Sequence, residues 1–318
     1  MRKVKKSELL IILILVVVFI GIIIANSRLI IRSMVNQTQQ TGQTQIDSIK
    51  TDFENHIASA ENSLIRVASG AEQLLKQDAD MSALESYIKE QKKAQLNSSD
   101  GVNFNVYIAG LGWEIIPDFD APADYHATER NWYVGAADNA GDIYITSPYI
   151  DSMTGEMCYT LSVMLKDKET VVAMDFTLSE IQDSVQKMSL SEGSSAMIVA
   201  KDGLIVGYTD MSYVGKELKK SLPEYDSVLQ KIQDSRSEES FRTTVNGNSS
   251  TIFYSITKNN WYMILSVNDS ELYSATTRQV LINAMINLMM LIVIVILTSL
   301  LLKTVSGQKR PRQTGNVL

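Results

Sequence analysis

The sequence has few of the residues on which metal centres and catalytic sites most often depend. Its 318 residues include one cysteine, Cys158, and two histidines, His56 and His126. A single cysteine excludes an internal disulfide, and the histidines lack the spacing of metal ligands. The glycine patterns of a P-loop or a dinucleotide-binding fold are missing as well, and no nucleophile–base pair stands out. The sequence therefore predicts no cofactor, no metal site and no enzymatic activity.

Positive charge is also scarce between the two ends of the chain. The whole sequence carries a formal charge of −7, residues 1–8 carry +3 and residues 303–318 carry +4, which leaves −14 for residues 9–302. An acidic segment of this kind repels phosphate groups. We therefore expect no nucleic-acid partner and no adhesion of this segment to anionic lipid headgroups.

What the sequence does contain is two long apolar runs. Residues 9–31 include an uninterrupted stretch from Leu9 to Ala25, and residues 280–302 are broken by only four polar side chains. Each run is long enough to cross about 30 Å of hydrocarbon as a helix. The first could instead be a cleaved signal peptide. Its apolar stretch is longer than in such peptides and a helical pattern continues behind it, which favours a retained anchor.

Basic residues flank these two runs on the same side. Four precede the first run and four follow the second. Since cytoplasmic loops are enriched in lysine and arginine, we expect both ends, residues 1–8 and 303–318, in the cytoplasm. Residues 33–278 would then lie outside, and the chain is predicted to pass twice through a lipid bilayer.

A regular apolar stripe follows the first run. Its members step by three and four residues and are Ile46, Ile49, Phe53, Ile57, Ala60, Leu64, Val67, Ala71 and Leu74. This spacing predicts a long helix, and Met81–Gln95 predicts a second one. A stripe this narrow is typical of a coiled-coil seam, so it could join two copies of the chain in a homodimer. It could equally pack against the chain's own domain, and the sequence leaves both interpretations open.

From Val102 the apolar pattern changes to the alternation of strands. Predicted strands lie at Asn103–Ala109, Trp113–Ile116, Ile143–Thr146, Met157–Leu165, Val171–Phe176, Ala196–Ala200, Leu204–Tyr208, Ser240–Val245, Thr251–Ile256 and Trp261–Val267, with helices at Trp132–Ala137, Leu178–Met188 and Pro223–Ile232. They fall into two units, about 100–188 and about 193–268, and each has an Ala-x-x-Gly turn between its first two strands, at Gly112 and Gly203. We therefore expect an α+β fold with a long N-terminal helix and two tandem α/β modules instead of one large sheet.

Three short segments carry a resemblance to a known family. They are Arg130-Asn131-Trp132-Tyr133, Ser147-Pro148-Tyr149-Ile150-Asp151 and Val172-Ala173-Met174-Asp175. In this order and spacing, between two apolar runs, they resemble the membrane-distal module of the double Cache (dCache) sensor domain of bacterial chemoreceptors, sensor kinases and cyclic-di-GMP enzymes. The resemblance covers about residues 33–278. It implies two PAS-like modules and a receptor of the bacterial inner membrane that binds a small extracellular metabolite.

One subset of this family is similar to amino-acid receptors. The residues that match its pattern are Tyr125, Arg130, Trp132, Tyr133 and Asp175, with Tyr149 between them. The resemblance implies that Arg130 grips the carboxylate of an amino acid, that Asp175 takes its ammonium group, and that the aromatic rings form the walls. Asp175 stands out in its own right, because it interrupts the apolar strand Val171–Phe176, where an unpaired carboxylate is costly.

Other interpretations remain open on the sequence alone. Arg130 could be a surface arginine, and Trp132 and Tyr133 could be ordinary core aromatics. The ligand could be an amine, a purine or an organic acid. A structural or adhesion ectodomain without a ligand would leave Arg130 and Asp175 far apart.

Residues 303–318 are too few to fold into a coiled signalling hairpin, a kinase or a nucleotide cyclase. We therefore expect a truncated or split receptor, or one that acts through a separate cytoplasmic or membrane signalling partner.

Overall fold

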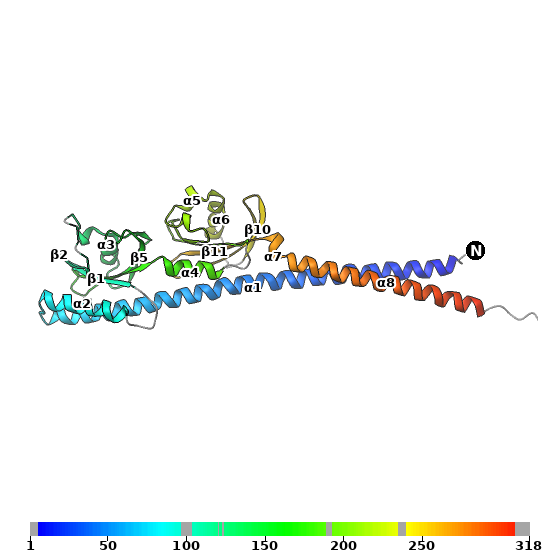
Figure 1. Cartoon of the computed structure of the whole chain (residues 1–318), viewed down its shortest axis with the longest axis horizontal. Helices are drawn as coiled ribbons and strands as arrows, with labels where there is room; N and C mark the ends of the chain where they lie inside the picture. The colour runs from blue at the N-terminus through cyan, green and yellow to red at the C-terminus, as the bar shows by residue number, and fades with distance from the viewer. Residues whose placement is uncertain are drawn as a thin grey trace, which may run out of the picture. The chain divides into compact units, whose positions relative to one another are not determined.

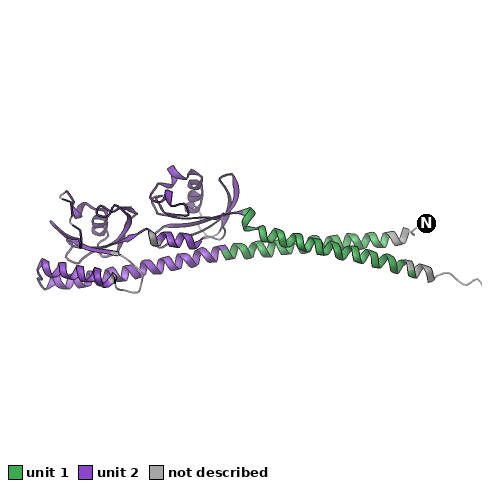
Figure 2. Ribbon diagram, viewed as in Figure 1, with its two compact units in different colours: residues 1–41, 269–318 green, residues 42–268 purple. Residues whose placement is uncertain are grey.

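A computed structural model describes residues 6–96, 104–119, 121–122, 124–188, 193–234 and 240–308. The chain divides into two compact units, which are coloured separately in Figure 2. One consists of residues 1–41 and 269–318, and the other of residues 42–268.

The first unit is helical. It contains the start of helix α1 (Lys6–Lys76), the short helix α7 (Asp269–Leu272) and the long helix α8 (Ser274–Gln308). Two helices are long and apolar enough to cross a membrane, and almost none of their most apolar stretches is buried within the protein. Polar groups in α8 bond within the helix, as Asn287 Nδ2 donates to the carbonyl of Asn283 at 2.8 Å. These properties suit a hydrocarbon environment, in which a helix must satisfy its own polar groups.

In the second unit, the remainder of α1 runs beside two antiparallel sheets (Figure 1). The apolar stripe from Ile46 to Ala71 is buried there, and Leu74 at its end is partly exposed. The stripe therefore packs against the chain's own domain, which decides between the two interpretations of its spacing. The homodimer predicted through this membrane-proximal helix stays a prediction.

Helix α2 (Met81–Leu96) folds back along the end of α1. Asp80 starts α2, since its carboxylate accepts a hydrogen bond from the backbone N–H of Ala83 at 2.8 Å. Gly70 allows the close approach, because a Cβ atom there would lie 2.0 Å from the hydroxyl of Tyr87. That hydroxyl donates to the carbonyl of Val67 at 3.2 Å, so the two helices are joined by a specific contact.

The first sheet has the strand order β2-β1-β6-β5-β3, with β4 also paired to β5. Its strands are β1 (Phe104–Gly110), β2 (Trp113–Ile115), β3 (Tyr144–Ile145), β4 (Tyr149–Ile150), β5 (Met157–Met164) and β6 (Val171–Thr177). The 3₁₀ turn η1 (Ala127–Glu129) leads into α3 (Asn131–Asp138), which lies on the face away from α1 (Figure 1).

The second sheet has the order β8-β7-β11-β10-β9. Its strands are β7 (Ser195–Val199), β8 (Ile205–Tyr208), β9 (Phe241–Val245), β10 (Asn248–Ile256) and β11 (Tyr262–Asn268). Helix α4 (Ser179–Met188) packs on β7 and β8 from one face, and Gln182 Nε2 donates to the carbonyl of Tyr208 at 2.8 Å. The turn η2 (Met211–Tyr213) and helices α5 (Leu218–Ser221) and α6 (Pro223–Asp234) cover the other face.

The two sheets touch through the indole of Trp261, which lies just before β11. Its ring centroid is 5.7 Å from that of Tyr159 on β5 and 5.8 Å from that of Phe53 on α1. Close by, the backbone N–H of Lys258 donates to the carboxylate of Glu54 at 2.9 Å. Residues from both sheets and from α1 therefore share one packed contact.

The predicted architecture is confirmed: a long N-terminal helix precedes two separate antiparallel sheets with helices on their faces. Both Ala-x-x-Gly turns are present, with a φ of +79° at Gly112 and +88° at Gly203, a conformation that glycine adopts without strain. The predicted helix near Trp132 is α3. The short elements β4, α5, η2 and α7 were not predicted, because two to four residues carry too little periodicity.

Candidate functional site

One face of the first sheet is only partly covered. On this face, residues that pair across β1, β6 and β5 form rows of side chains. The first row contains Ala109 and Val171, the second contains Tyr107 and Ala173, and both pack beneath α3 in a common core. Ser162 of β5 joins the sheet to α3, since its hydroxyl donates a hydrogen bond to the carbonyl of Trp132 at 2.7 Å. The third row reaches past the helix, and a cleft opens above it.

Asp175 forms the floor of this cleft. Its Oδ1 atom accepts a hydrogen bond from the Tyr107 hydroxyl at 2.7 Å and from the Thr160 hydroxyl at 2.6 Å. The Tyr149 hydroxyl lies 3.4 Å from the same atom and 2.6 Å from the Thr160 hydroxyl. All of these bonds go to Oδ1, and no other described residue donates to Oδ2. One carboxylate oxygen is therefore held in place and the other is left for a ligand.

The environment of Asp175 is costly for a negative charge. The pKa of its carboxyl is raised to about 6: burial is the largest cause, the charge of Asp151 adds to the rise, and the hydroxyl hydrogen bonds oppose it. Burial and the neighbouring carboxylate also raise the pKa of the Tyr107 and Tyr149 hydroxyls, which keeps them protonated as donors. Within the part of the chain that the structure describes, no cation pairs with Asp175. A ligand cation would relieve that cost.

Arg130 supplies a positive charge on the other side of the cleft. It precedes α3 in an extended conformation, and its backbone carbonyl accepts the first hydrogen bonds of that helix. Its guanidinium lies 5.4 Å from the Tyr125 ring centroid and donates to the hydroxyl of Ser152. Across the described ranges, no carboxylate lies within ion-pair distance of Arg130. One unpaired cation and one unpaired anion therefore line the same cleft.

Five of the six residues predicted for the site line this cleft, namely Tyr125, Arg130, Trp132, Tyr149 and Asp175. The sixth, Tyr133, lies in the core below α3, where its hydroxyl donates to the carbonyl of Glu169 at 2.6 Å. Its ring centroid is 5.8 Å from that of Trp132, which it supports from behind. Tyr133 thus contacts a lining residue without lining the cleft.

The structure adds residues that were not predicted. The cleft is also lined by Asn105, Val106, Tyr107, Ile116, Pro117, Phe119, Asp151, Ser152 and Met153. The strand alternation offered a signal for two of them, since Asn105 and Tyr107 share one face of β1. Thr160, which bonds Asp175 without lining the cleft, is likewise a polar residue in a largely apolar strand. Residues of the turn after β4 and of the segment after β2 carried no such pattern.

The empty space in and above the cleft is about 430 Å³, including the part open to solvent. The mixture of aromatic walls with a few fixed polar groups is typical of small-molecule sites. The arrangement can bind a small molecule that carries a positive and a negative group. In the described residues no cluster of His, Cys, Asp or Glu could hold a metal ion.

Curated relatives share much of this chain. It is 26% identical over 301 residues to the methyl-accepting chemotaxis protein McpC of Bacillus subtilis. The matched region covers 92% of this chain and 44% of McpC. It is 26% identical over 286 residues to the methyl-accepting chemotaxis protein PscA of Pseudomonas syringae, covering 86% of this chain and 42% of PscA. The chain thus spans less than half the length of these relatives.

Solved structures show the same fold. The ligand-binding domain of the Pseudomonas fluorescens chemoreceptor CtaA, in complex with L-isoleucine, matches with a TM-score of 0.56 and 24% identity, covering 79% of this chain and 98% of that one. The ligand-binding domain of the Pseudomonas aeruginosa PAO1 amino-acid chemoreceptor PctB, in complex with L-arginine, matches with a TM-score of 0.59 and 20% identity, covering 76% and 91%. Both likenesses establish the architecture.

The sequence model of the Cache domain matches residues 26–276, which include α1 from its apolar run onward and both sheets. That match spans most of the chain, and it agrees with the two-sheet architecture and with the solved structures. The chain therefore belongs to the Cache domain family, in its double form.

Proposed function

We propose that this protein is a two-pass membrane receptor that binds a free α-amino acid in the cleft of the first sheet. The observation that carries the proposal is that Arg130 and Asp175, each without an ion-pair partner among the described residues, line one cleft. An adhesion or structural domain would have no reason to bring these charges together. A zwitterion needs both, because each of its ends gives up hydration on binding and an unmatched end opposes it.

The ligand's carboxylate would bind the planar guanidinium of Arg130, which can donate two parallel hydrogen bonds. Its ammonium group would bind Oδ2 of Asp175 and the faces of the surrounding aromatic rings. Because the Tyr107 and Thr160 hydroxyls already hold Oδ1, the carboxylate needs no rearrangement when the ligand arrives. An amine would lack the group that Arg130 binds, and an organic acid the group that Asp175 binds.

Related proteins support the amino-acid class. Solved relatives are in complex with L-isoleucine, with asparagine and with L-arginine. Their identity to this chain is low, so the assignment of an amino acid as the ligand depends on the residues of this chain's own cleft. Amines, purines and organic acids remain the competing classes.

A signal from the cleft would pass to the membrane through the second sheet. Asp175 and Thr160 sit next to Phe176 and Tyr159 on the same strands, and Tyr159 contacts Trp261. Trp261 directly precedes β11, the central strand of the second sheet, and β11 leads without a loop into α7 and α8. We propose that ligand binding shifts these contacts and moves α8.

The remaining parts of the proposal follow from the charges and the apolar helices. Both ends of the chain would lie in the cytoplasm and residues 33–278 outside the bacterial inner membrane. The receptor would act as a homodimer and pass its signal to a cytoplasmic output or a separate signalling protein.

Calorimetric titration of the full chain in detergent micelles tests the ligand class. Amino acids, amines, purines and organic acids are titrated in turn. We expect heat of binding from at least one amino acid and weaker or no heat from its decarboxylated and deaminated analogues. Tighter binding of a purine or an organic acid than of every amino acid would overturn the proposal.

A further inference from the structure

We propose that the cleft selects amino acids with an unbranched or branched apolar side chain over those with a charged one. This inference rests on the proposed function and concerns the apolar part of the cleft. That part is lined by Ile116, Pro117, Phe119 and Met153. Three of these come from one short segment directly after β2, and the fourth comes from the turn after β4.

The strand order places this apolar wall at a defined distance from the charged floor. Asp175 is on β6, β1 lies between β6 and β2, and the wall begins where β2 ends. Neighbouring strands are about 4.8 Å apart, so β2 is about 10 Å from β6. That separation matches the reach of a side chain of three or four carbons on an amino acid whose ammonium group binds Asp175.

The nearest cation to the wall is already engaged. Lys92 of α2 forms an ion pair with Asp118 at 2.8 Å, lies 3.4 Å from the carbonyl of Pro117 and 5.6 Å from the centroid of the Phe119 ring. Its side chain is mostly buried and does not line the cleft. Lys92 thus holds the segment Pro117–Phe119 in position without offering a charge to a ligand. An acidic side chain lying against Ile116 and Phe119 would therefore lose hydration without gaining a partner from Lys92.

A second carboxylate, on the turn that carries Met153, is engaged as well. Asp151 starts the turn after β4, where its Oδ1 accepts a hydrogen bond from the N–H of Met153 at 3.2 Å. Its Oδ2 accepts from the N–H and the hydroxyl of Thr154 at 3.0 and 2.7 Å. These bonds fix the turn that presents Met153 to the cleft. A basic side chain lying against the apolar wall would give up its hydration there, and the oxygens of Asp151 are already hydrogen-bonded within the turn.

A homologous series tests the inference on the full chain in detergent micelles. L-alanine, L-2-aminobutyrate, L-norvaline and L-norleucine differ by one methylene each. Burying one methylene corresponds to about a fourfold gain in affinity, so we expect the dissociation constant to fall by about fourfold at each step until the cleft is filled. L-glutamate and L-lysine should bind at least tenfold more weakly than L-norvaline.

Two variants locate the effect. Ile116→Ser and Met153→Ser should flatten the series, so that L-norleucine gains less than half as much over L-alanine as in the parent. The ratio of the two constants within one variant does not depend on the fraction that is folded. Leu111→Ser changes an exposed apolar residue of the β1–β2 turn that does not line the cleft, and it should leave the ratio unchanged.

The outcomes separate this inference from the proposed function. Binding of amino acids with a flat or falling series, or with L-glutamate or L-lysine tightest, would overturn the apolar selection and leave the amino-acid receptor standing. Absence of binding by every amino acid would overturn both. An unchanged series in Ile116→Ser and Met153→Ser would show that the wall is not where the side chain lies.

Discussion

The two sheets of this protein have the same strand pattern but use one face differently. Counting facing rows from the start of β6 and of β11, the third row of the first sheet contains Asp175 beside Thr160. The third row of the second sheet contains Ser266 beside Ile252. A charged floor in one sheet thus corresponds to an uncharged row in the other, in which Ser266 also pairs with Ser195.

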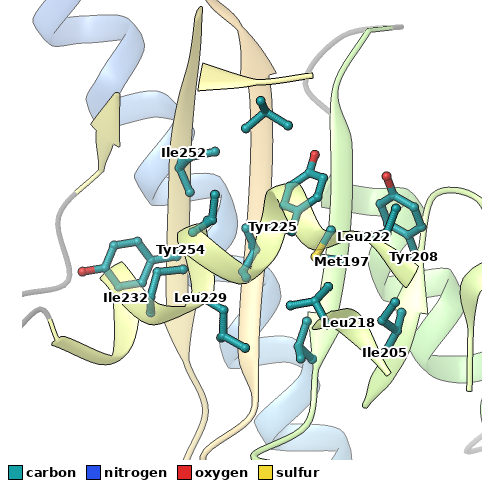
Figure 3. Packing of buried hydrophobic residues seen from close by; sticks show 14 residues of the cluster. Met197, Ile205, Tyr208, Leu218, Leu222, Tyr225, Leu229, Ile232, Ile252 and Tyr254 are labelled. Atoms are coloured by element: carbon teal, nitrogen blue, oxygen red, sulfur yellow. The ribbon is translucent and has the colours of Figure 1, made fainter. Parts of the chain in front are cut away.

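The helices that cover the two faces differ in length. Helix α3 has eight residues and leaves the third row open, whereas α6 has twelve and fills the corresponding face of the second sheet. Figure 3 shows Tyr225, Leu229 and Ile232 of α6 packed with Tyr254 and Ile252 of the sheet. The same architecture therefore leaves an open cleft or closes into a solid core, depending on how far the helix reaches and on one row of side chains.

The largest effect is expected where the face is filled. Tyr225 is 2% exposed and packs edge-on against Tyr208, so Tyr225→Ala should lower the free energy of unfolding by about 3–5 kcal/mol, as for other large aromatics. Calorimetric melting of the full chain in micelles measures it. Met211→Ala, at an exposed position of the same module, should stay within about 0.5 kcal/mol of the parent. Equal melting of the two variants would show that the second sheet has no such core.

The next effect concerns the floor of the open cleft. Asp175→Asn keeps the shape of the side chain and removes the charge that the ammonium group needs, so amino-acid binding should weaken by about 2–5 kcal/mol in titration calorimetry. Ser266→Ala alters the matching row of the second sheet and should leave the affinity unchanged. Similar losses in both variants would mean that the two faces are not functionally distinct.

The same substitution should have the opposite effect on stability. The pKa of Asp175 in the folded protein is about 6, above its ordinary value of 3.8, so ionisation at neutral pH opposes folding. Each pKa unit corresponds to about 1.4 kcal/mol, and the open cleft reduces this, so Asp175→Asn should raise the free energy of unfolding by about 1–2 kcal/mol at pH 7. The gain should vanish as the pH falls below about 4, because the parent is then neutral too. A less stable variant at pH 7 would contradict the assigned burial cost.

A smaller effect is expected from pH. As the pH falls through about 6, Asp175 takes up a proton and loses its attraction for an ammonium group, so affinity should drop by up to tenfold per pH unit. The groups that face it are Tyr107, Tyr149 and Cys158, whose pKa values are raised, and the charges of Asp151 and Arg130. His126 is exposed and does not line the cleft, and His126→Gln should keep the same profile. A profile that is flat from pH 5 to 7.5 would count against Asp175 as the ammonium partner.

Most of the fold could be predicted because its elements are long or strongly alternating. The stripe from Ile46 to Leu74 and the strands around Val171–Phe176 are patterns that one sequence displays directly. The partner of the stripe could not be predicted, since a narrow apolar stripe fits a sister helix as well as a sheet. Only the three-dimensional packing showed that it lies against its own domain.

The candidate site was predictable where a residue breaks a local pattern. Asp175 is a charge inside an apolar strand, and Arg130 belongs to a motif of recognisable spacing. Tyr107 was missed, because a tyrosine in a strand is ordinary locally and becomes part of the cleft only through strand pairing. Asp151 closes one of the three family segments but was not assigned to the site. Tyr133 was assigned to the cleft by its motif, whereas its side chain points into the core.

The most direct test of the account is the carboxylate clamp. The tightest-binding amino acid and the amine that results from removing its carboxylate are titrated into the parent and into Arg130→Ala, as full chains in micelles. Because the guanidinium is partly exposed, the variant should bind the amino acid about 2–3 kcal/mol more weakly, roughly 30- to 150-fold, and bind the amine within twofold of the parent. Undiminished binding of the amino acid by Arg130→Ala would contradict the assignment of this cleft to a zwitterion.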